Sequence, residues 1–238
     1  MPDRRKHRGP HPKDAKNFGD DMLESLRASV SELSWLLSRD YAIDAALKVV
    51  GDRHQLVARQ RVAVRRAAAS DEAVKRREGS EVGLDSVNES LVIDGFNLIV
   101  TIEAALSGGV LLKCRDGAIR DLASVHGSYR QVNETLAAIE LIASVLGKNG
   151  SVHVKWLLDS PVSNSGRLAT VLREYAEAQK QRWEVELRHD VDAALMQSAY
   201  PIVTSDSRIL DGNVRWINLA DGVIADCESQ PWVVDLRT

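Results

Sequence analysis

From residue 91 onward the chain alternates short apolar runs with segments of helical periodicity, and this alternation limits its fold more than any other feature. Such alternation predicts an α/β domain with a mostly parallel sheet and helices on both faces. The expected strands are Leu91–Ile93, Val152–Leu158, Trp183–Leu187, Ile202–Thr204 and Val214–Leu219. The expected helices follow Asn97 and cover residues 118–129, 132–146 and 166–179.

Acidic residues follow these expected strands. Asp94, Asp159 and Asp206 each come directly after an apolar run, and Asp190 and Asp192 follow another. One such aspartate means little, and for Asp159 or Asp206 taken alone a helix cap or a turn is the favoured explanation. Because the carboxyl ends of parallel strands meet at one edge, where α/β sheets bind ligands, their joint occurrence indicates a binding site.

Several carboxylates at one edge repel one another unless a cation neutralises them. A hard, oxygen-ligated divalent metal is the natural partner, and we expect Mg²⁺ or Mn²⁺. Such an ion can bind a phosphate oxygen and activate water for attack on a phosphodiester. The acids therefore indicate metal-dependent phosphate chemistry.

The amino-terminal part has a different pattern, which predicts four regions along the chain. Residues 1–19 are charged and proline-rich, which is typical of a flexible arm. Apolar residues at helical spacing predict a helical domain over 20–78, with helices from Asp21, over Ala42–Val50 up to a turn at Gly51, and over Asp52–Ala69. Residues 79–90 lose periodicity and are expected to link this domain to the α/β domain, 91–238.

Charge is unevenly distributed between these parts. Residues 1–80 carry 17 Lys and Arg against 12 Asp and Glu, whereas residues 81–238 carry 14 against 22. The third expected helix places Arg59, Arg61, Arg65 and Arg66 on one face. Two interpretations are equally supported: the face binds nucleic-acid phosphates, or it is the solvated face of a helical bundle.

Other classes of protein lack support in the sequence. The chain has neither a P-loop nor a dinucleotide-binding glycine motif, and Phe96 occupies the position where a haloacid-dehalogenase phosphatase needs its second aspartate. Two distant cysteines indicate neither a disulfide framework nor a cysteine zinc site. Without a signal sequence or an uninterrupted apolar span, we expect a cytoplasmic protein with no membrane partner.

Two stretches of the α/β part resemble a known group of nucleases. IDGFN, at 93–97, resembles the first-strand D-G-x-N signature of the NYN branch of PIN-like nucleases. DVDAALMQSAYPIVTSDSRIL, at 190–210, is similar to that group's later stretch, in which an aspartate opens a helix and a strand ends in a Ser/Thr/Asn-Asp pair. The chain also resembles an uncharacterised prokaryotic family that joins a helical domain to a PIN-like domain.

The resemblance implies a three-layer α/β/α fold and a divalent-metal nuclease that hydrolyses RNA. It assigns metal-binding carboxylates to Asp94 and Asp206, a first-strand amide to Asn97, and an intermediate acid to Asp190 or Asp192. Asp159 is a further candidate ligand with a weaker counterpart. Candidate substrate contacts are Arg59, Arg61, Arg65, Arg66, Asp116, Arg167 and Ser205.

Residues 115–130 belong to the uncharacterised family and not to the nuclease pattern. Their basic residues, Arg115, Arg120, His126 and Arg130, either contact phosphates or form a solvated helix face, and the second interpretation is favoured for each. A different class of function also stays open, namely a nucleic-acid-binding or scaffold protein without catalysis. The sequence leaves a homo-oligomer open as well.

Overall fold

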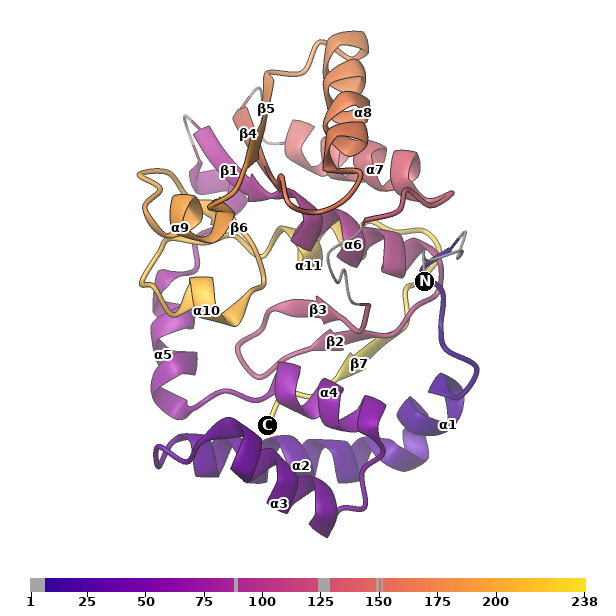
Figure 1. The fold of residues 1–238 in the computed structure, drawn as a ribbon, viewed down its shortest axis with the longest axis vertical. Helices are drawn as coiled ribbons and strands as arrows, with labels where there is room; N and C mark the ends of the chain where they lie inside the picture. The colour runs from indigo at the N-terminus through magenta and orange to yellow at the C-terminus, as the bar shows by residue number, and fades with distance from the viewer. Residues whose placement is uncertain (1–6, 88–89, 124–128, 149, 151) are drawn as a thin grey trace.

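The computed structural model describes residues 7–87, 90–123, 129–148, 150 and 152–238 (Figure 1). Helices dominate the amino-terminal region, and strands alternate with helices in the remainder. The amino-terminal helices are α1 (Asp14–Phe18), α2 (Asp20–Leu37), α3 (Ile43–Arg53), α4 (Ala58–Ala67) and α5 (Asp71–Ser80). Leu26, Val30 and Leu33, spaced by four and three residues on α2, are fully buried because this helix packs against both α3 and α4.

Some boundaries in this region differ from the sequence predictions. The predicted flexible arm, 1–19, is wrong for α1, because Asp14 and Phe18 are buried; residues 1–6 lie outside the described part. The predicted turn at Gly51 is also wrong, since this residue lies inside α3. A Cβ atom there would come within 2.3 Å of Nη1 of Arg61, so glycine leaves room for this guanidinium group against α3.

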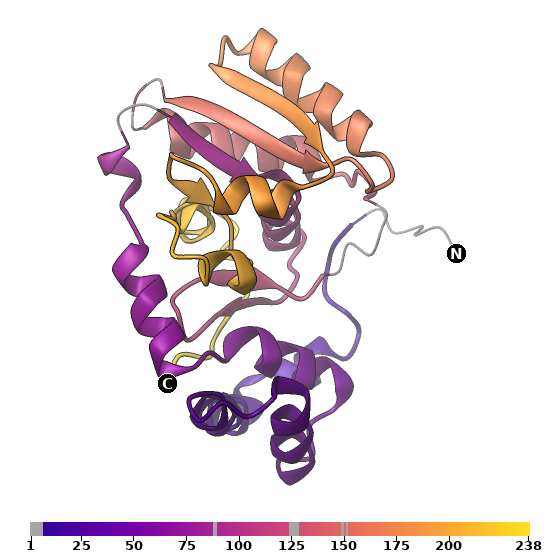
Figure 2. The same cartoon turned by 60° about the vertical axis from the view of Figure 1, so that its left-hand side comes forward.

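The predicted linker, 79–90, is structured where it is described. It contains the end of α5, a 3₁₀ helix, η1 (Leu84–Ser86), and Glu81, which forms a bridge with Trp216. Residues 88–89 lie outside the described part. In both views α5 and the segment after it lead from the helical region up to the parallel sheet (Figures 1 and 2).

Sheet A contains the predicted parallel strands. Its order is β5-β4-β1-β6, and every pair is parallel. The strands are β1 (Ser90–Asp94), β4 (His153–Asp159), β5 (Trp183–Arg188) and β6 (Ile202–Val203). The predicted strand Val214–Leu219 is reduced to bridges at Trp216, one of them with Ile202 of β6.

Helices cover both faces of sheet A, which confirms the three-layer α/β/α prediction. Ile93 and Trp156 lie on the face covered by α6, α7, α8 and α11, whereas Val92 and Leu157 lie on the face covered by α9 and α10. These helices are α6 (Gly95–Leu106), α7 (Thr135–Gly147), α8 (Ser165–Ala178), α9 (Val191–Met196), α10 (Ser207–Leu210) and α11 (Leu219–Ala225).

A second, smaller sheet was not predicted. Sheet B has the order β3-β2-β7 and consists of β2 (Leu111–Lys113), β3 (Ile119–Asp121) and β7 (Val233–Asp235). The predicted helix over 118–129 is therefore wrong for its first residues, which form a hairpin that turns at Gly117 with φ of +78°. Residues 124–128, which include His126, lie outside the described part.

Sheet B joins the two parts of the chain through a shared core. Leu112 of β2, Val234 of β7 and Leu236 pack in one apolar cluster with Leu33 of α2 and Val64 of α4. Figure 2 shows sheet B between the amino-terminal helices and the layers around sheet A. Across the residues described, no helix combines the length and apolar character that a membrane crossing requires.

Candidate functional site

The strand order of sheet A creates a switch point between β1 and β6. From β1 the chain proceeds outward through β4 to β5, then returns to the other side of β1 as β6. In doubly wound sheets, ligands bind outside the carboxyl ends of the strands at such a point. Asp94 ends β1 here, and Thr204, Ser205 and Asp206 directly follow β6.

Asp94 is fixed by contacts with both segments. Its carboxylate caps α6 by accepting a hydrogen bond from the Asn97 N–H at 3.3 Å, and it accepts a second from Thr204 Oγ1 at 2.9 Å. Gly95 allows this tight strand-to-helix turn, because a Cβ atom there would lie 2.5 Å from Leu158 Cδ2 and 3.0 Å from the Leu157 carbonyl oxygen. The conformation of IDGFN thus follows from the close packing of α6 on β4.

The electrostatics of Asp94 differ from those of a simple helix cap. The side chain is 8% exposed, and burial is the main reason that its pKa is raised to about 7. The hydrogen bonds from Thr204 and Asn97 act in the opposite direction, whereas repulsion by Asp159 and Asp206 raises the pKa further. Asp94 therefore changes its charge near neutral pH.

Asn97 connects the ends of β1 and β6. Its Oδ1 atom accepts hydrogen bonds from the backbone N–H of Ser205 at 2.8 Å and from Ser205 Oγ at 3.0 Å. The next residue, Asp206, caps α10 by accepting from the Arg208 N–H at 2.8 Å. The structure thus brings together Asp94, Asn97, Ser205 and Asp206, all of which the sequence predicted for the site.

The remaining acids lie along the same edge, in different environments. The pKa of Asp159 is raised by burial and by repulsion from Asp192, which places these two carboxylates near one another. Asp192 also pairs with Arg208 at 2.6 Å. Asp190 is exposed and pairs with Arg188 through both carboxylate oxygens, which holds the pKa of Asp190 below its usual value. Of the two candidates for the intermediate acid, Asp192 is the one whose charge acts on Asp159.

The acids do not form a closed metal cage in the described part of the chain. Within 7–87, 90–123, 129–148, 150 and 152–238, no three Asp, Glu, His or Cys side chains lie close enough to hold one ion together. All the candidate ligands are oxygen donors, which suits Mg²⁺ or Mn²⁺ in chemistry. Mg²⁺ commonly needs only one or two carboxylates, because waters and substrate phosphates complete its coordination. The donor set therefore fits such an ion in the presence of a phosphate substrate.

The arginines of α4, predicted as substrate contacts, have partners within the protein. Arg59 pairs with Asp14, Arg61 with Asp52, Arg65 with Asp44, and Arg66 donates to the carbonyl oxygens of Asp121 and Ala123. A guanidinium group already engaged in this way must exchange partners before it can bind a phosphate. Their arrangement favours a structural role for this face.

These arginines should contribute differently to stability, because their ion pairs are buried to different degrees. Asp14 is fully buried and accepts from Arg59 at 2.5 and 2.8 Å, so Arg59→Gln should lower the free energy of unfolding by about 3 kcal/mol by leaving a buried carboxylate unpaired. Arg65→Gln is the matched control, because its pair with Asp44 is exposed, and we expect a change within about ±0.5 kcal/mol. Urea unfolding of both variants measures the difference, and equal effects would contradict this distinction.

Two other predicted substrate contacts, Asp116 and Arg167, differ in their exposure to solvent. Asp116 is buried beneath Arg77 and Arg120, which leaves it no free surface for a substrate. Arg167 is exposed in the first turn of α8. The hydrogen bond from Thr204 to Asp94 was not predicted from the sequence. The run IVTSD could have indicated it, because it places a hydroxyl two residues before Asp206 at the end of the same strand.

Fold and site together define an α/β protein with a doubly wound parallel sheet, an acidic edge at its switch point and a helical amino-terminal region. The chain belongs to the family described as Domain of unknown function (DUF5616), whose model matches residues 85–222. A second model, Protein of unknown function (DUF434), matches residues 25–79. Uncharacterized protein MJ0935 of Methanocaldococcus jannaschii is 30% identical over 195 residues, covering 81% of this chain and 93% of that protein. No solved structure matches the chain.

Proposed function

We propose that this protein is a divalent-metal-dependent nuclease of the PIN-like class that hydrolyses RNA phosphodiester bonds. The observation that carries the proposal is Asp94, a buried carboxylate at the switch point whose charge is disfavoured by burial and by two neighbouring acids. A bound cation would reverse that imbalance, and perturbed carboxylates in a sheet-edge position are typical of functional sites. The preference for RNA rests on the resemblance of residues 93–97 and 190–210 to NYN nucleases.

Each residue of the site has a role under this proposal. Asp94 and Asp206 would hold Mg²⁺ or Mn²⁺, with Asp159 and Asp192 adding negative charge or orienting water along the edge. The cation would polarise the phosphate and offset its negative charge when bound. Asn97 keeps the turn after β6 against α6 through its two contacts with Ser205. The exposed guanidinium of Arg208 pairs with Asp192 and would have to exchange this partner to contact a substrate phosphate.

A cleavage assay with matched carboxylate variants tests the proposal. Purified protein is incubated with single- and double-stranded RNA and DNA in the presence of Mg²⁺, Mn²⁺ or EDTA. We expect metal-dependent cleavage of RNA that Asp94→Asn and Asp206→Asn reduce at least about 100-fold, because several kcal/mol of charge stabilisation are lost. Asp190→Asn is the control, since Asp190 is exposed and paired with Arg188, and it should retain activity. Cleavage that survives EDTA, or that Asp94→Asn leaves unchanged, rejects the site.

One alternative is a nucleic-acid-binding protein without catalysis, in which Asp94 serves only to cap α6 and to accept a hydrogen bond from Thr204. Such a protein would show salt-dependent RNA binding but no turnover with either metal. It would also bind RNA equally well with and without EDTA, whereas the proposed nuclease should bind substrate more tightly with its cation present.

A further inference from the structure

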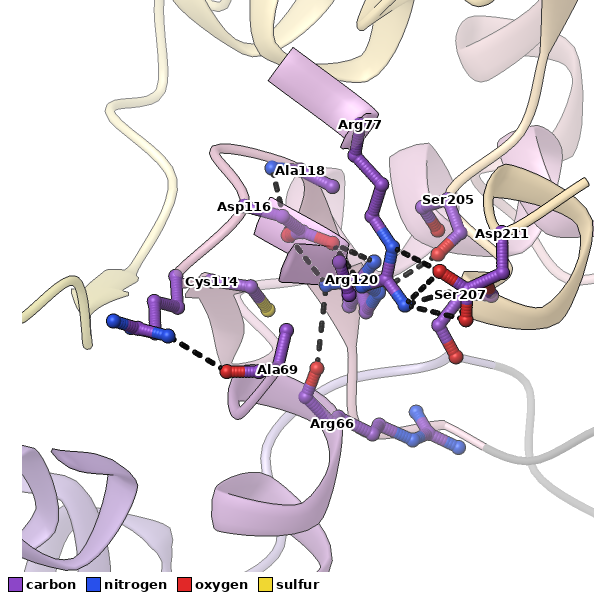
Figure 3. A network of polar contacts seen from close by, with 12 residues as sticks. Arg66, Ala69, Arg77, Cys114, Asp116, Ala118, Arg120, Ser205, Ser207 and Asp211 are labelled. Carbon is purple, nitrogen blue, oxygen red and sulfur yellow. Dashed lines mark hydrogen bonds and ion pairs between the residues drawn. The ribbon is translucent and has the colours of Figure 1, made fainter. Parts of the chain in front are cut away.

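A buried cluster of charged residues lies behind the candidate site and joins three parts of the chain (Figure 3). At its centre is Arg120 of β3. Its Nη1 and Nη2 atoms donate to the two carboxylate oxygens of Asp116 at 2.8 and 2.6 Å, and its Nε atom donates to the Ser205 carbonyl oxygen at 2.7 Å. Nη1 also donates to the Arg66 carbonyl oxygen at the end of α4, at 3.2 Å. One guanidinium group thus contacts the hairpin, the helical region and the turn that follows β6.

Arg77 of α5 extends the cluster to Asp211, which follows α10. It donates to Asp116 at 2.7 Å and to both carboxylate oxygens of Asp211 at 2.9 to 3.0 Å, and Nη2 reaches the Ser207 carbonyl oxygen at 3.4 Å. Arg120 and Arg77 therefore hold the segment 205–211 at its beginning, within it and at its end. That segment contains Asp206, a proposed metal ligand.

The charged groups of this cluster are buried, and each of them has a partner of opposite charge. The Asp116 side chain has no exposed surface, and those of Arg77 and Arg120 are nearly as buried. Burial alone would raise the pKa of Asp116, but the two guanidinium groups overcome this effect and lower it. A buried network in which every member is paired fixes one arrangement of its surroundings, because any displacement leaves a charge unpaired.

We propose that Arg120, anchored by Asp116 and assisted by Arg77, is a positioning residue for the candidate site. Ser205 is held from two sides, since its carbonyl oxygen accepts from Arg120 while its N–H donates to Asn97 Oδ1. The position of Asp206 relative to Asp94 then depends on the hairpin and on α5, which belongs to the helical region. This inference deepens the proposed nuclease function and rests on it for its catalytic consequence. It assigns the helical region a role in the geometry of the acidic edge.

The test compares Arg120→Lys with Arg8→Lys as a matched control. Lysine keeps the charge but cannot donate in the fixed directions needed to reach Asp116 and Ser205 together. Arg8 pairs with the buried Glu103, and the exposed fractions of these two side chains, 8% and 0%, equal those of Arg120 and Asp116. The Arg8 pair lies away from Ser205, so it reports only the general effect of weakening a buried ion pair. Urea unfolding first establishes conditions in which both variants are fully folded.

Amide hydrogen exchange of peptides spanning 203–211 is the first measurement, because it requires no activity. Arg120→Lys should accelerate exchange at Ser205 and Asp206, whereas Arg8→Lys should not. Asp211→Asn is a second variant for the case in which Arg120→Lys does not fold, since Asp211 is half-exposed and its loss frees the far end of the segment. It should accelerate exchange over 207–211. Unchanged exchange in whichever of Arg120→Lys and Asp211→Asn folds, or equal acceleration in Arg8→Lys, overturns the proposal.

Cleavage kinetics supply the second measurement. In the folded Arg120→Lys protein we expect kcat to fall about tenfold with KM little changed, as for other residues that orient ligands of a metal. Arg8→Lys should leave both constants near those of the wild type. If the wild-type protein cleaves nothing, the proposed function fails, while the exchange measurement still decides whether Arg120 positions the turn.

Discussion

Asp94→Asn should stabilise the folded protein above pH 7 while abolishing the proposed cleavage. The reason is that Asp94 must be charged in a buried position beside Asp159 and Asp206, and a neutral amide of the same shape removes that repulsion. The amide oxygen can still accept from the Asn97 N–H, so the cap of α6 is kept. A gain in stability that accompanies a loss of function is expected where a site holds a charge for chemistry and not for folding.

The sign of this effect follows from the pKa of Asp94 in the two states. The folded protein holds the proton up to about pH 7, whereas the unfolded chain releases it near the ordinary value of 3.8. The stability that protonated Asp94 contributes is fully present below pH 3.8 and is lost as the pH rises through about 7. At ~1.4 kcal/mol for each unit of pKa difference, the loss amounts to roughly 4 kcal/mol.

Urea unfolding at pH 5 and pH 8 measures this difference. The free energy of unfolding of Asp94→Asn should exceed that of the wild type at pH 8 and approach it at lower pH. Asp190→Asn serves as the control, because the pKa of Asp190 is lowered by Arg188 and its replacement should bring no gain at pH 8. An Asp94→Asn protein less stable than the wild type at pH 8 would show that Asp94 is chiefly a structural cap.

Asp116→Asn should produce the largest loss of stability among the acidic residues discussed. The substitution leaves the buried guanidinium groups of Arg77 and Arg120 without the carboxylate they share, and breaking a buried pair in this way costs about 3 to 5 kcal/mol. Thermal or urea unfolding measures the change. Asp71→Asn is a matched control, since Asp71 pairs with Arg115 in the same region but is exposed, and it should change stability little. Similar losses in the two variants would contradict the buried-cluster interpretation.

The strands of sheet A could be predicted because their sequences are unambiguous. Leu91–Ile93 and Val152–Leu158 are rich in apolar residues, and each is followed directly by an aspartate, which marks the carboxyl end of the strand. Helices α7 and α8 were predictable from apolar residues at helical spacing. Because the carboxyl ends of parallel strands share an edge, the same pattern also predicts that Asp94 and Asp206 lie close together.

Sheet B could not be predicted for reasons of length and polarity. Its strands have three residues each, which is too few for a period-2 pattern to be distinguished from a loop or a helix. The sequence around Arg120 was misleading as well, since an arginine normally marks a solvated position, whereas here it is buried by its contacts with Asp116 and Ser205.

The buried cluster was beyond sequence reasoning because its partners are distant in the chain. Arg77 meets Asp116 across 39 positions, and Arg120 meets Ser205 across 85. No local spacing rule connects residues so far apart. The partners of the α4 arginines were beyond sequence reasoning for the same reason. A helical wheel shows a basic face, but it does not show that Asp14, Asp44 and Asp52 lie against that face.

The shared core of sheet B and the amino-terminal helices also shapes how this protein reaches its fold. Val234 and Leu236 cover apolar side chains of α2 and α4, yet they are translated long after those helices. A nascent chain therefore carries uncovered apolar helix faces until the segment that contains β7 has been synthesised. Closing contacts between segments so distant in sequence gives a high contact order, which slows folding and lengthens the exposure of these faces to aggregation.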